Sequence, residues 1–119
     1  MAAWGGISGL QLGRSVTWSG ARARGYSLSQ VVKWMCEAPA RLAGLENKKG
    51  HIAKGYDADL VVFEPEAAFK VDVQRIEHRH KLTPYADAGL TGVVTSTYVR
   101  GQRVFHLGEH ARELKGQFL

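Results

Sequence analysis

Two nearly contiguous stretches decide the fold: Glu37-Ala-Pro-Ala-Arg-Leu-Ala-Gly-Leu45 and Lys49-Gly-His-Ile-Ala-Lys-Gly-Tyr-Asp-Ala-Asp-Leu-Val-Val-Phe-Glu-Pro65. The first predicts a short helix from Pro39 to Ala43, because proline is favoured at the first helical position and Gly44 follows the end. The second contains glycine turns and then a run, Leu60 to Phe63, that predicts a buried strand closed by Pro65. The chain therefore changes from helices to strands near residue 48.

Upstream of these stretches the sequence predicts two more helices. Residues 14–24 form the first, which Gly25 ends. Ser27 and Gln30 have the spacing of a capping box, which starts a second helix over residues 28–36. Its apolar face is expected to consist of Leu28, Val31, Val32 and Met35.

Downstream the sequence predicts short strands around an irregular polar link, residues 72–89. Ala68 to Val71 could form a strand before the link, and Val93 to Val99 a strand after it. Arg100 and Gly101 provide turn chemistry, so Arg103 to His106 is predicted to return as a hairpin partner. Helices first and few strands after is an unusual order for a free-standing domain, and we expect the isolated chain to fold poorly.

Composition excludes several classes of protein. The 119 residues are 45 % hydrophobic and 23 % charged, which is typical of a small globular domain. No apolar run is long enough to cross a bilayer, so no membrane association is expected. The net charge of +5 comes from dispersed basic residues without interleaved aromatics, which favours a solvated surface over nucleic-acid binding.

The single cysteine and the N-terminal composition bear on the compartment. Cys36 has no partner for an internal disulfide, so a reducing intracellular setting is favoured, with Cys36 as a buried, inert thiol. The first 36 residues lack Asp and Glu but contain arginines, as mitochondrial transit peptides do. The spaced glycines near the start fit a loop better than a presequence, so a cytoplasmic location is favoured over a mitochondrial one.

Three groups of residues are candidates for chemistry. His78 and His80 would face the same way on a strand and could share a metal, but surface or linker histidines are the favoured interpretation. Asp57 and Asp59 precede a strand, where turn capping outweighs acid–base chemistry. In Trp4-Gly5-Gly6 the glycines would let backbone amides approach a ligand beside a Trp wall, and a plain tight turn is the alternative. No catalytic constellation is evident.

The two opening stretches resemble the C-terminal signature of the metal-dependent amidohydrolase superfamily, where such a segment links the last barrel helix to a small β-sandwich. His80-Lys-Leu-Thr-Pro-Tyr85 and the hairpin Tyr98-Val-Arg-Gly-Gln-Arg-Val104 favour the cyclic-amide branch. Ala3-Trp-Gly-Gly-Ile-Ser-Gly-Leu-Gln11 is similar to the loop after the last barrel strand of allantoinases. One departure is that Ala86-Asp87-Ala88 replaces the glycine expected after the Pro-Tyr pair.

The resemblance implies an α/β partial fold: the C-terminal end of a (β/α)8 barrel, with its last helices, plus strands of the small β-sandwich. Residues 1–47 would be the last loop and helices of the barrel, and residues 48–119 the sandwich strands and linker. Full-length relatives would be homotetramers acting on a small cyclic ureide.

The resemblance also implies two zinc ions bridged by a carboxylated lysine in the full-length enzyme, which would open the hydantoin ring of allantoin to give allantoate. None of those ligands, and no catalytic residue, maps onto this chain; they would lie upstream of Met1. The transferable site residues are Trp4, Gly5 and Gly6, whose backbone would contact the substrate. Two alternatives are another cyclic-amide hydrolase, of the dihydropyrimidinase or hydantoinase type, and a non-catalytic interaction module.

Overall fold

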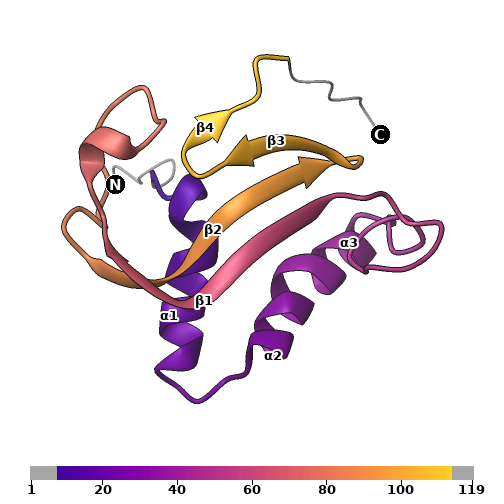
Figure 1. The fold of residues 1–119 in the computed structure, drawn as a ribbon. Coiled ribbons are helices and arrows are strands. Elements are labelled where there is room, and N and C mark those ends of the chain that lie inside the picture. Colours follow the sequence, from indigo (N-terminus) through magenta and orange to yellow (C-terminus); the bar gives the residue numbers. More distant parts are fainter. Residues whose placement is uncertain (1–7, 114–119) are drawn as a thin grey trace, which may run out of the picture.

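A computed structural model describes residues 8–113, which form a helical layer packed on one antiparallel sheet (Figure 1). The sheet has four strands in the order β1-β2-β3-β4, so each strand pairs with its neighbour in sequence. The helical elements are η1 (Leu10–Leu12), α1 (Gly13–Arg22), α2 (Leu28–Val32), the π-helix η2 (Lys33–Glu37), α3 (Ala38–Leu42) and η3 (Val73–Arg75). The strands are β1 (Leu60–Lys70), β2 (Gly89–Val99), β3 (Gln102–His106) and β4 (Glu109–His110).

The first two predicted helices are confirmed. Helix α1 ends before Gly25, which adopts φ +79°. The capping box at the start of α2 is complete, because the Ser27 N–H donates to Gln30 Oε1 at 2.8 Å and the Gln30 N–H donates to Ser27 Oγ at 3.3 Å. These bonds satisfy backbone donors that an uncapped helix leaves unpaired.

The break predicted before Pro39 is a π-helical turn. The chain remains helical from Leu28 to Leu42, and η2 replaces the expected kink. Because proline has no N–H to donate, a local widening of the helix is one way to accommodate it. Gly44, at φ +70°, ends α3 as expected. The predicted apolar face is only partly correct, since Val31 is buried whereas Val32 is exposed.

Two predictions about strand β1 were wrong. Pro65 does not close it, because β1 continues to Lys70 across an irregularity in which residues 65–67 oppose Gly92. Proline is tolerated there since β1 is an edge strand and no ladder donor is needed in the irregularity. Val61 and Val62 are not buried but 40 % and 48 % exposed, whereas Phe63 packs against the cluster of Trp18, Ala21 and Val31.

The C-terminal hairpin is confirmed. Arg100 and Gly101 both have positive φ, 49° and 81°, which is the backbone of the tight turn expected between β2 and β3. Strand β2 begins at Gly89, earlier than predicted, and pairs with β1 over most of its length. The segment 72–88 is irregular apart from η3, as the sequence predicted.

Within residues 8–113, two small clusters form the core. In one, Leu12 packs with Val71, Ile76 and Leu90; the other consists of Trp18, Ala21 and Val31. The first joins residues from both predicted segments, 1–47 and 48–119, so these two parts share a core. Residues 8–113 contain neither the parallel barrel strands nor the second sheet of the sandwich, and those parts of the fold stay predictions.

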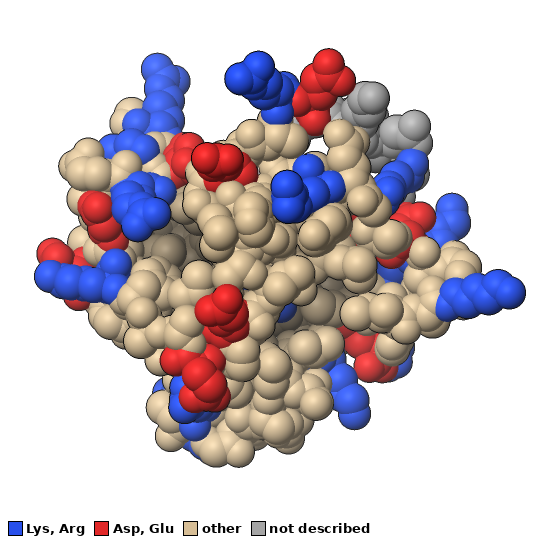
Figure 2. All heavy atoms as spheres, in the orientation of Figure 1, with Lys and Arg blue, Asp and Glu red and all other residues tan. Residues whose placement is uncertain are grey.

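The charged residues are dispersed over the surface, as their distribution in the sequence suggested. On the face in Figure 2, lysines and arginines are interspersed with acidic residues and do not gather into one basic patch. Within residues 8–113, no helix combines the length and apolar character needed to cross a membrane.

Candidate functional site

The predicted substrate loop, Trp4-Gly5-Gly6, lies outside the described residues, and the structure shows how the segment that follows it is held. Thr83 donates its hydroxyl proton to the Ser8 carbonyl at 2.6 Å. Gln11 donates from Nε2 to the Arg75 carbonyl at 3.3 Å and accepts at Oε1 from the Glu77 N–H at 2.8 Å. Segment 8–12 is therefore fastened to the link at two separate places.

Apolar packing supports the same attachment. Leu12 lies in the cluster with Val71, Ile76 and Leu90, and Tyr85 packs against its edge. Thr83 is buried, with only 4 % of its surface exposed. Its hydroxyl accepts a hydrogen bond from the Tyr85 N–H at 3.4 Å. Because a threonine hydroxyl has one proton, the Tyr85 bond leaves that proton for Ser8.

Residues Ala86-Asp87-Ala88, which stand where a glycine was expected after the Pro-Tyr pair, have a defined conformation. Asp87 adopts φ 62°, the left-handed region that glycine usually occupies and that aspartate tolerates better than most residues. Its N–H donates to the Val71 carbonyl, and the Val71 N–H donates to the Ala88 carbonyl, at 3.1 and 2.9 Å. Asp87 therefore forms a turn with positive φ that two backbone hydrogen bonds close.

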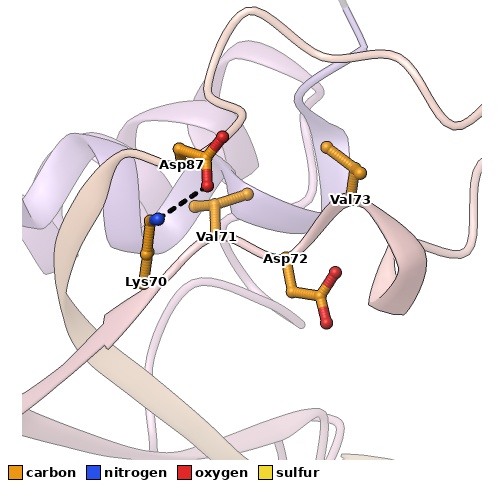
Figure 3. Close-up of a pocket in the computed structure, with 5 residues that line it drawn as sticks. All are labelled: Lys70, Val71, Asp72, Val73 and Asp87. Carbon is orange, nitrogen blue, oxygen red and sulfur yellow. Dashed lines mark ion pairs between the residues drawn. The ribbon is translucent and has the colours of Figure 1, made fainter.

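An open cavity of about 290 Å³ lies beside this turn (Figure 3). Lys70 and Asp87 form an ion pair of 2.7 Å at its edge, and this hydrogen bond raises the pKa of Lys70. Asp72 is occupied elsewhere, since it accepts the Gln74 N–H and starts η3. Both charges of the pair are mostly exposed, so the cavity has no enclosed polar group that would bind a ligand.

Asp57 and Asp59 are architectural, as predicted, but their main partner was not foreseen. Lys49 contacts both carboxylates, at 3.0 Å for Asp57, and Asp59 also accepts the Arg100 N–H at 2.8 Å. The bond from Lys49, followed by that from the Arg100 amide, lowers the pKa of Asp59. The bonds of Lys49 to Asp59 and then to Asp57 raise the pKa of Lys49. This cluster ties the glycine turns to the β2–β3 hairpin.

The lowered pKa of Asp59 predicts a loss of stability in acid. A carboxylate whose pKa is depressed in the folded state stabilises it above the unfolded value, here 3.8, and loses that contribution as the pH falls through the folded value. Asp59→Asn should cost about 1 kcal/mol at pH 7, since the pair is partly screened by solvent. Thermal midpoints of the two proteins, measured from pH 7 to pH 3, should converge below pH 4; parallel curves would contradict this assignment.

The described residues do not fit the metal centre that the resemblance implies. Among residues 8–113, no three His, Cys, Asp or Glu side chains come together in a group that could hold a metal ion. Residues 78–80 lie in bends and not on a strand, so the favoured interpretation of His78 and His80 as linker histidines is confirmed. The Nδ1 atom of His78 is buried without a hydrogen-bond partner.

Cys36 is half-buried, not buried as predicted.

A second depression, of about 440 Å³, lies between α2, η2 and the turn at Gly50. Gly50 has φ +88°, and a Cβ there would meet Ala40 at 2.9 Å, so the turn packs directly on the helix. Leu28 and Val32 give the depression an apolar floor, and Lys33, Glu37 and His51 surround it. This mixture of side chains defines no specific ligand.

The sequence analysis did not identify Gln11, Thr83 and Lys49 as residues whose side chains connect separate segments. Thr83 had one available signal, because the following proline restricts it to an extended backbone and so fixes its side-chain direction. For Gln11 and Lys49 no local pattern exists, since their partners lie far along the chain or in a turn.

Comparison with solved structures shows the same architecture in larger enzymes. The chain is similar to the L-hydantoinase (dihydropyrimidinase) from Arthrobacter aurescens, with a TM-score of 0.85 and 34 % identity over 93 % of this chain and 25 % of that one. Residues 3–105 match the amidohydrolase family. The chain belongs to this family, whose members are generally metal-dependent.

Curated relatives narrow the resemblance within the family. The chain is 50 % identical to the allantoinase of Streptomyces avermitilis over 98 % of its length, covering 26 % of that protein. It is 45 % identical to the allantoinase of Arabidopsis thaliana, again over 98 % of its length and 23 % of the relative. The chain thus spans about a quarter of the curated relatives that it matches.

Proposed function

We propose that this chain is the C-terminal part of an allantoinase-like zinc hydrolase, which opens the hydantoin ring of allantoin to give allantoate. The observation that carries the proposal is the identity of 50 % and 45 % to two allantoinases over nearly the whole chain, against 34 % to the hydantoinase. A (β/α)8 barrel would precede this part, and its site would lie at the carboxyl ends of the strands.

This chain's own contribution to the reaction is to position the substrate and to hold the fold together. Ring opening by such an enzyme needs a metal-activated water and a polarised carbonyl, chemistry that zinc supplies when bound. Residues 8–113 offer no ligand set for zinc. In this proposal the ligands would lie in the preceding barrel. Trp4, Gly5 and Gly6 would present backbone groups and an aromatic wall to the ring. We also propose that the full-length protein is a homotetramer located in the cytoplasm.

The test is the substrate preference of the native protein. An antibody against residues 77–85, most of which are exposed, would isolate the protein that carries this segment. We expect the isolated protein to hydrolyse allantoin at least tenfold more efficiently than dihydrouracil or unsubstituted hydantoin, as kcat/KM. Preference for dihydrouracil would instead identify a dihydropyrimidinase, the alternative that the similarity to the Arthrobacter enzyme favours.

A non-catalytic role is the remaining alternative. Leu42 and Ile52 are almost fully exposed, and a partner that covers them would bury apolar surface. A native protein that hydrolyses none of the three substrates with zinc present, and that co-purifies with a full-length amidohydrolase, would support that role and contradict the enzyme proposal.

A further inference from the structure

We draw no further inference here: the strongest candidate, the depression with an apolar floor of Leu28 and Val32 between α2, η2 and the turn at Gly50, carries none, because nothing in residues 8–113 shows what covers it.

Discussion

Gly92→Ala should destabilise the protein by about 3 kcal/mol or more, a large fraction of the stability of a small domain. Gly92 has φ +93°, which side chains rarely adopt, and an added Cβ would lie 2.3 Å from Phe63 Cζ and 2.7 Å from Trp18 Cδ1. Both rings belong to one cluster between the helices and the sheet, so neither can move away cheaply.

The position explains why a glycine is needed there. Gly92 faces the irregularity of β1, where residues 65–67 oppose it, and its carbonyl accepts the Ser15 hydroxyl of α1 at 2.6 Å. Helix α1 and strand β2 are therefore in direct contact at this residue. Gly89→Ala in the same strand is the matched control, because a Cβ at Gly89 meets nothing within 4 Å.

The measurement is the thermal midpoint and soluble yield of the protein expressed from its complete coding sequence. Gly92→Ala should lower both, and Gly89→Ala should change neither appreciably. Equal midpoints for the two alanine variants would show that the close approach at Gly92 is not a constraint on the fold.

Trp18→Ala should cost about 3–5 kcal/mol, the range for removing a large buried aromatic side chain. Trp18 is 6 % exposed, packs with Ala21 and Val31, and donates its Nε1 proton to the Pro65 carbonyl at 2.8 Å. That carbonyl lies in the irregularity of β1, where ladder pairing is interrupted. The indole thus fills the core and also provides a donor that the sheet does not.

Trp18→Phe separates these two contributions. Phenylalanine keeps most of the apolar volume and loses the donor, so the expected cost is about 1–2 kcal/mol, well below that of alanine. Thermal unfolding of the three proteins measures the order. If Trp18→Phe were as destabilising as Trp18→Ala, the bond to Pro65, not core filling, would dominate.

Local signals predicted the elements that depend on local chemistry. The capping box at Ser27, the stop at Gly44 and the turn at Arg100-Gly101 each involve residues a few positions apart, so the sequence pattern contains the whole interaction. Glycine and proline were informative for the same reason, since they act on their own backbone.

The errors arose where tertiary contacts override local rules. Pro65 is a strand breaker by its own geometry, but the edge position of β1 and the bond from Trp18 allow the strand to continue. Val61 and Val62 look like core residues, yet their exposure depends on which face the helices cover. The partners of Gln11 and Thr83 could not be predicted, because Arg75 and Ser8 lie more than 60 positions away from them in sequence.

For the candidate site, the sequence indicated which loop contacts the substrate only through a family resemblance. The predicted residues, Trp4, Gly5 and Gly6, lie outside residues 8–113, and that assignment stays a prediction. The described residues show only how the segment that follows, residues 8–12, is held by Arg75, Glu77 and Thr83.

The central claim is that this chain completes an enzyme whose metal ligands lie elsewhere in the same protein. The mass of the native protein, detected in source cells with the antibody to residues 77–85, tests it most directly. We expect a species larger than this 13.1 kDa chain by the mass of roughly 250 residues or more, the size of a barrel. A lone species of 13.1 kDa would contradict it.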